Sequence, residues 1–154
     1  MIAVWAGYLS GIAILLSFAP YIRDILRGIT KPERTSWLLW TILGVISFLS
    51  QWTKGASWSL LLVGTQAVGD AVIFILAIWY GLGGFAKRDK IGLTGAAIAL
   101  ILWYFTGEAA VALFLAILID AIGAILTVFK TYENPSTETV SSWVALNFSF
   151  IGTV

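Results

Sequence analysis

The chain has 154 residues, of which 60% are hydrophobic and 11% are charged, and its formal net charge is +1. Soluble domains carry about 25% charged residues, so this composition excludes an ordinary water-soluble fold and predicts an all-α, polytopic membrane protein. The small net charge excludes a nucleic-acid-binding surface. Because the sequence contains neither Cys nor His, disulfides, thiolate or imidazole metal sites and most nucleophile–base pairs are excluded, and we expect no enzyme activity, metal or cofactor.

Six apolar segments follow one another, and each is a predicted membrane span. They are, approximately, Ile2–Ile22, Ser36–Trp52, Ser57–Tyr80, Ile91–Phe105, Ala109–Phe129 and Val140–Val154. A perpendicular helix needs about 20 residues to cross the hydrocarbon, so the second and fourth segments are short, and flanking Trp and Thr residues are expected to extend them. The first lacks a preceding basic region, which indicates a retained span rather than a signal peptide. The sixth has no polar flank, which indicates that a seventh span is missing.

The stretch Pro20–Trp37, which joins the first two segments, carries four basic residues and two acidic ones. Pro20 lies near the end of the first span, where a proline either terminates a helix or provides a hinge; termination is the favoured interpretation. The basic side chains are expected to fix the topology, and binding of anionic lipid headgroups is the alternative.

Basic residues concentrate in alternate loops. The first loop holds four, the third holds Lys87, Arg88 and Lys90, and the fifth has Lys130 at its edge, whereas the second holds only Lys54 and the fourth holds none. By the positive-inside rule, the odd-numbered loops lie in the cytoplasm and the N-terminus lies outside. We therefore predict a multi-pass protein of a bacterial-type inner membrane.

Two carboxylates, Asp70 and Asp120, lie deep in apolar segments. A charge at that depth costs at least about 2.5–3.5 kcal/mol, so each must face a partner or a wet cavity. Gln66 precedes Asp70 by four residues and therefore shares its helix face. We predict that these three side chains line a substrate-binding cavity; the alternative is that they only form hydrogen bonds between helices.

Trp40 follows Trp37 by three residues, so the two share a helix face, and Trp40 is predicted to line the cavity. Asn147 follows Trp143 by four residues, so the two share a helix face. Trp143 lies at the start of its segment, a position that favours anchoring at the membrane interface, and anchoring is also the favoured role for Trp37.

The sequence contains an internal repeat. A shift of 106 positions places Trp37 on Trp143 and Ser36 on Ser142, and it aligns the apolar run before each polar loop. An odd number of spans separates the copies, so they point the same way and form a parallel repeat. This predicts a first triple-helix unit at 1–84, a linker helix at 85–107 and the first two helices of a second unit at 108–154.

This pattern resembles the PQ-loop superfamily, which includes the SWEET and SemiSWEET sugar transporters. The resemblance rests on Pro20-Tyr21 at the cytoplasmic end of the first helix, the basic loop, Ser36-Trp37, and the partial repeat before Trp143. Tyr21 replaces the eponymous Gln, and the second copy reads Leu126-Thr127 with neither Pro nor Gln, so symmetric bending at two prolines is not implied here.

The resemblance implies that the chain transports a small polar solute, a sugar or a metabolite, by alternating access. Family pockets hold sugars between Trp and Asn side chains, which gives Trp143 and Asn147 that role by similarity. The expected partners are membrane lipids and a small-molecule solute. The alternative function is a non-catalytic accessory subunit of a larger membrane complex, and the sequence also leaves assembly as a homo-oligomer open.

Overall fold

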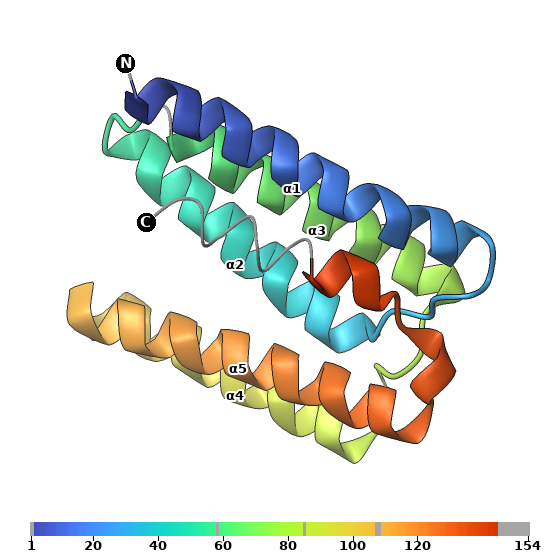
Figure 1. Ribbon diagram of the computed structural model, residues 1–154. Coiled ribbons are helices and arrows are strands. Elements are labelled where there is room, and N and C mark those ends of the chain that lie inside the picture. The colour runs from blue at the N-terminus through green and yellow to red at the C-terminus, as the bar shows by residue number, and fades with distance from the viewer. Residues whose placement is uncertain (1, 58, 85, 107–108, 145–154) are drawn as a thin grey trace.

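The computed structural model describes residues 2–57, 59–84, 86–106 and 109–144, and these are all-α, as the sequence predicts (Figure 1). The elements are α1 (Ile2–Leu26), α2 (Arg34–Thr53), α3 (Ser59–Tyr80), α4 (Lys87–Thr106), α5 (Ala109–Glu133) and the short 3-10 helix η1 (Pro135–Thr137). The chain is helical again over residues 140–144.

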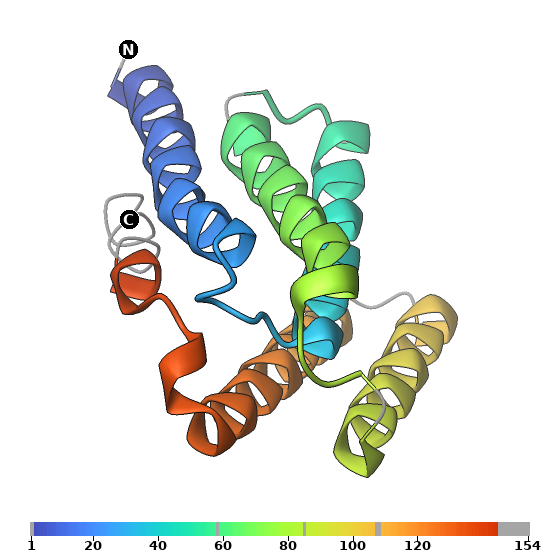
Figure 2. The ribbon, with the colours of Figure 1, turned by 90° about the vertical axis from the view of Figure 1, so that its right-hand side faces the viewer.

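The helices do not pack in chain order. Helix α3 lies between α1 and α2, α5 packs on α2, and α4 packs mainly on α5 (Figures 1 and 2). The polar segment after α5 carries residues 140–144 back beside α1, where Trp143 contacts Tyr21 (Figure 2). The space bordered by α2, α3, α5 and Trp143 therefore combines elements from both ends of the sequence.

The helices are longer than the apolar segments that predicted them. Helix α2 starts at Arg34 and α4 starts at Lys87, so each has 20 residues and is about 30 Å long. The expected extension by flanking residues is confirmed at Thr35, Thr53 and Thr106, and charged residues at the helix starts extend the two helices further. Two stretches of the described chain, Leu60–Tyr80 and Phe114–Glu133, are apolar and long enough to cross a membrane.

Apolar side chains cover the outer faces of the bundle, while many polar ones point inward. The exposed large apolar residues include Leu15, Leu16, Val68, Ile75, Trp79, Ile98, Ile101, Phe105, Phe114, Ile125 and Val128. The buried polar residues include Ser17, Glu33, Thr35, Ser36, Asp70, Asp89, Thr127 and Lys130. A water-soluble protein shows the opposite distribution, with charged groups outside and few of them buried.

Pro20 does not end α1, so the favoured interpretation of termination was wrong. The helix continues through Pro20 to Leu26. The chain turns only at Gly28, whose φ of 73° is the left-handed conformation that glycine adopts at helix C-termini. The N–H groups of Ile29 and Thr30 then satisfy the carbonyl of Asp24. Proline within a helix removes one backbone hydrogen bond, so the hinge role of Pro20 stays a prediction.

Gly69 and Gly64 let α3 approach its two neighbours closely, as small residues in apolar helices predict. A Cβ added to Gly69 would overlap the ring of Phe18 on α1, and one added to Gly64 would lie 3.1 Å from the ring of Phe48 on α2. The Phe18 side chain is 5% exposed, so its ring has little room to move away.

We expect Gly69→Ala to lower the stability of the folded protein by about 1–3 kcal/mol, because the new methyl group overpacks the α1–α3 contact. Gly95→Ala in α4 is the matched control, since its Cβ would meet only Ile122, at an ordinary 3.7 Å, and alanine is the better helix former. Thermal unfolding of both variants in detergent measures the difference. Equal melting temperatures for the two variants would contradict the tight α1–α3 packing.

Candidate functional site

A cavity of about 640 Å³ lies between α2, α3 and α5. It is lined by Trp37, Trp40, Leu43, Gly44, Ser47, Gln51, Leu62, Val63, Gln66, Asp70, Ala116, Ile117, Asp120, Ala124 and Trp143. Along α2 it extends from Trp37 near the start of the helix to Gln51 near its end, a distance of about 20 Å. This volume lies in the range of small-molecule binding sites.

Three indole rings form one end of the cavity. The ring centroids of Trp37 and Trp40 are 5.1 Å apart, those of Trp40 and Trp143 are 5.8 Å apart, and those of Trp37 and Trp143 are 6.2 Å apart. Trp37 is 3% exposed, so its predicted role as an interface anchor was wrong. Trp40 and Trp143 are partly exposed and line the cavity. The close approach of Trp40 to α5 depends on Gly123, because a Cβ there would lie 2.9 Å from the indole nitrogen.

The carboxylates occupy two walls of the cavity. Asp70 on α3 is 3% exposed, and Gln66 Nε2 donates to its two oxygens at 3.1 and 3.3 Å, so these two side chains do share a helix face. Asp120 lines the cavity from α5 and is exposed. The hydrogen-bond partner of Asp70, Gln66, belongs to the same helix. This differs from the alternative prediction, in which these side chains form hydrogen bonds between helices. The polar stripe faces the cavity.

Five of the six predicted substrate residues therefore come together around one cavity: Asp70, Asp120, Gln66, Trp40 and Trp143. The sixth, Asn147, lies outside the described residues. The binding role of all six stays a prediction. Ser47 and Gln51 also line the cavity; they follow Trp40 at positions seven and eleven residues on, and this helical spacing was the signal that could have found them.

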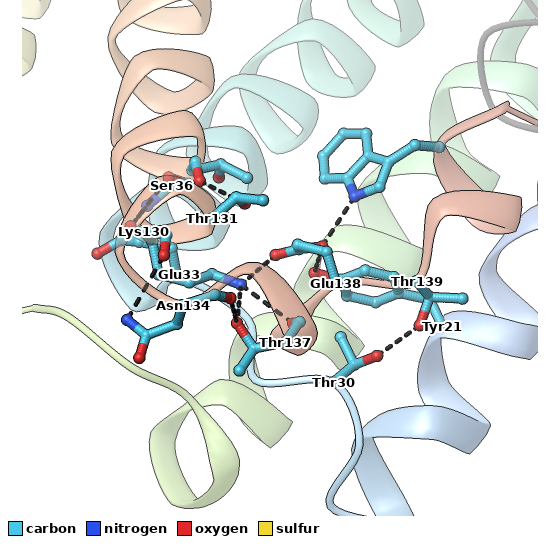
Figure 3. Close-up of polar contacts among 12 residues, drawn as sticks. Tyr21, Thr30, Glu33, Ser36, Lys130, Thr131, Asn134, Thr137, Glu138 and Thr139 are labelled. Atoms are coloured by element: carbon cyan, nitrogen blue, oxygen red, sulfur yellow. Dashed lines mark hydrogen bonds and ion pairs between the residues drawn. The ribbon is translucent and has the colours of Figure 1, made fainter.

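A buried polar network lies behind the indoles, at the end of the bundle that holds the first, third and fifth loops (Figure 3). Glu138 is its centre: it forms an ion pair with Lys130 and accepts hydrogen bonds from the Tyr21 hydroxyl at 3.0 Å and Trp143 Nε1 at 2.8 Å. The Lys130 ammonium also donates to the carbonyl and hydroxyl of Thr137 at 3.1 and 3.2 Å. Lys130 is 1% exposed, so it is a buried structural cation rather than a surface charge of the fifth loop.

Further contacts join the loop after α1 to the segment before residues 140–144. The hydroxyls of Thr30 and Thr139 are hydrogen-bonded to each other, and Thr139 lies 3.0 Å from a carboxylate oxygen of Asp24. The backbone N–H of Lys31 donates to the carbonyl of Thr137 at 3.0 Å. Together with the Glu138 network, these bonds close the structure between α1, α2 and α5 at this end, which we call the basic end.

Glu33 caps α2 at the basic end. Its carboxylate accepts the N–H of Ser36 at 2.5 Å, and the Ser36 hydroxyl donates to the carbonyl of Gly123 on α5 at 2.6 Å. The bridge thereby links the start of α2 to α5. Burial raises the pKa of Glu33, and its hydrogen bonds to Ser36 oppose that shift.

Arg34 ties α2 to the C-terminus of α3. Its guanidinium donates to the carbonyls of Ala77 at 2.8 Å, Gly83 at 2.9 Å and Ile78 at 3.4 Å. Backbone bonds reinforce the contact, because Arg34 N donates to the Leu82 carbonyl at 2.9 Å. The carbonyls at a helix C-terminus have no partner within the helix, and a cation is the natural donor for them.

Sequence analysis missed this network. Lys130 was interpreted as a topology signal, and Glu138 was given no role. The available signal was their separation across Asn134 and Pro135, where a turn brings residues eight positions apart together. Comparison of the chain with protein-family models, with curated proteins and with solved structures finds no match.

Proposed function

We propose that the chain is a multi-pass inner-membrane transporter that moves a small polar solute, a sugar or a metabolite, by alternating access in a PQ-loop-like bundle. The observation that carries this proposal is the cavity of about 640 Å³, lined by two carboxylates and three indoles and closed behind the indoles by the Glu138 network. An alternating-access cycle requires closure on one side of the binding site in each of its end states, and the Glu138 network is the candidate closure on the basic side.

The surface of the bundle supports the membrane part of the proposal. The outer faces of the helices are apolar, and five helices of 20 to 25 residues are each long enough to cross the hydrocarbon. The basic residues gather at the basic end, and Lys54 is the exception at the other end. This distribution supports a cytoplasmic basic end and an N-terminus outside.

Two contacts support a parallel repeat of the units 1–84 and 108–154 around the linker at 85–107. Helix α2 packs on α5, and the segment 140–144, which corresponds to the start of α2, packs on α1 (Figure 2). The equivalent residues Trp37 and Trp143 contact each other, with ring centroids 6.2 Å apart. Equivalent residues meet in this way where a two-fold axis passes between two copies.

Single-cysteine variants test alternating access, and the natural chain supplies a cysteine-free background. Ser47 lines the cavity, whereas Ser142 is buried on the other side of the indoles, beside Ser17 and Tyr21. We expect a membrane-impermeant maleimide to modify Ser47→Cys only from the side of Lys54 and Ser142→Cys only from the basic side. The reason is that the two positions become accessible in opposite conformations. Labelling of both in reconstituted vesicles measures this.

Topology controls accompany the experiment. Arg27→Cys and Tyr132→Cys, both exposed, should be modified from one side and Lys54→Cys from the other. Modification of Arg27→Cys and Tyr132→Cys from opposite sides would overturn the parallel repeat. A Ser142→Cys variant that is never modified from the basic side would overturn alternating access, and co-purification with a fixed partner in addition would favour the accessory-subunit function.

A further inference from the structure

We propose that the cavity binds a small organic cation with N–H donors, an alkylammonium or alkylguanidinium ion, in preference to a neutral sugar. The inference deepens the proposed function and rests on it, since it assigns the chemical class of the transported solute. Three properties of the cavity carry it: its carboxylate acceptors, the lack of a Lys or Arg among the described residues that line it, and its indole surfaces.

The charged groups of the cavity lining are both acceptors, while Ser47 and Gln51 add groups that can donate as well as accept. Asp70 and Asp120 each present a carboxylate. The amide nitrogen of Gln66 donates to Asp70, and Gln66 Oε1 is buried without a hydrogen-bond partner in the described structure. An ammonium or guanidinium group offers three to five donors and no acceptor, and so matches this wall. A sugar hydroxyl is as much an acceptor as a donor and gains less from it.

No ion pair of the described residues involves Asp70 or Asp120. In the described parts of the chain, the ion pairs are Arg23–Asp24, Arg88–Asp89, Arg88–Glu133 and Lys130–Glu138, all at the basic end. The described residues that line the cavity include no Lys or Arg. Asp70 and Asp120 line the same cavity from α3 and α5. A carboxylate charge at membrane depth is costly, and a bound cation would offset that cost.

The indole rings also favour a cationic solute over a neutral one. Trp40 and Trp143 present partly exposed rings to the cavity, and indole is the best aromatic partner for a cation. Among the indoles, the N–H group of Trp143 is bound to Glu138, and those of Trp37 and Trp40 are buried with no hydrogen-bond partner in the described structure, so a neutral solute would find its donors at Ser47 and Gln51. A cation can therefore contact carboxylates and ring faces together.

A series of four-carbon probes of equal length tests the proposal. Butanediol carries no charge, aminobutanol carries one and diaminobutane carries two at neutral pH. Calorimetric titration of the purified, detergent-solubilised protein should give an affinity that rises by about tenfold with each charge, with glucose binding no better than the diol. Counterflow of labelled diaminobutane in vesicles then reports whether binding leads to transport.

Asp120→Asn identifies the group responsible, because it removes one carboxylate from the cavity without a change in size. We expect it to weaken diaminobutane binding by about tenfold while butanediol binding stays unchanged. Glu133→Gln is the matched control: it removes an acid from the same helix but outside the cavity, and should leave all probe affinities unchanged.

The outcomes separate the cation inference from the proposed function. Equal binding of diol, amino alcohol and diamine, or tighter binding of glucose, would overturn the cation inference while cysteine labelling could still support transport. Charge-dependent binding that Asp120→Asn and Asp70→Asn leave unchanged would overturn the assignment to this cavity. If diaminobutane binds but shows no counterflow, and the maleimide does not modify Ser142→Cys, transport is overturned and only a cation-binding site is left.

Discussion

Lys130→Met is expected to open the basic end of the cavity. In a Ser142→Cys background, we expect the variant to raise modification from the basic side at least about tenfold, and to lower the melting temperature of the purified protein. Removing one partner of a buried ion pair costs about 3–5 kcal/mol, because the remaining charge is left uncompensated. A conformation in which water reaches Glu138 avoids most of that cost.

The geometry of Glu138 explains why the effect should be an opening rather than unfolding alone. Glu138 joins three elements, since its partners are Tyr21 on α1, Lys130 on α5 and Trp143 in the segment 140–144. Without the ammonium, the carboxylate keeps only the Tyr21 hydroxyl and the Trp143 N–H group as donors. Water entering from the basic end is the nearest replacement, and its entry separates these elements next to Ser142.

Two further variants separate charge from packing. Lys31→Met removes an exposed basic residue at the same end and should leave labelling of Ser142→Cys unchanged. The double variant Lys130→Met/Glu138→Gln removes the charge of both partners, while the amide oxygen still accepts from Tyr21 and Trp143, so we expect it to restore closure. A Lys130→Met variant with labelling like that of the parent, or a double variant as open as the single one, contradicts the role of the ion pair.

The helices and the cavity residues could be predicted from sequence for the same reason. Apolar runs of about 20 residues determine helices by composition, and a carboxylate such as Asp70 or Asp120 within such a run must face inward because lipid does not solvate it. The position of these two side chains deep within apolar runs was therefore enough to predict that both face the interior of the bundle. The position of α3 between α1 and α2 has no equally local signal, since it depends on packing at Gly69 and Gly64.

The basic end could not be predicted in the same way. Arg34, Lys130 and Glu33 are charged residues near the ends of apolar runs, where the simplest expectation is exposure to water or lipid headgroups. Their burial depends on contacts between segments that are far apart in the chain, such as Arg34 with Gly83 and Lys130 with Glu138. Pro20 was misjudged for a related reason: the helix continues because Tyr21 and Ile25 are buried in the core, which outweighs the local preference of proline.

Arg34→Met is expected to lower the stability of the folded protein by about 2–3 kcal/mol, a larger loss than any other single basic residue of the first loop should cause. Hydrogen bonds from a charged donor contribute about 1.5–3 kcal/mol each, and Arg34 makes two at or below 2.9 Å and a weaker one at 3.4 Å. Its partly exposed position reduces the sum. Thermal unfolding in detergent at one fixed pH measures the loss.

The conservative variant decides between a structural role and a topological one. Arg34→Lys keeps the positive charge but lacks the planar fork that reaches Ala77 and Gly83 together, so we expect it to recover less than half of the lost stability. Arg27→Met removes an exposed charge from the same loop and should melt like the parent. If Arg34 acts only as a topology signal, Arg34→Lys will match the parent, and Arg34→Met will match Arg27→Met. If the bonds to the end of α3 matter, Arg34→Lys will melt below the parent and Arg34→Met will melt below Arg27→Met. These bonds join the start of α2 to α3, the helix that carries Asp70, and so hold two walls of the cavity together.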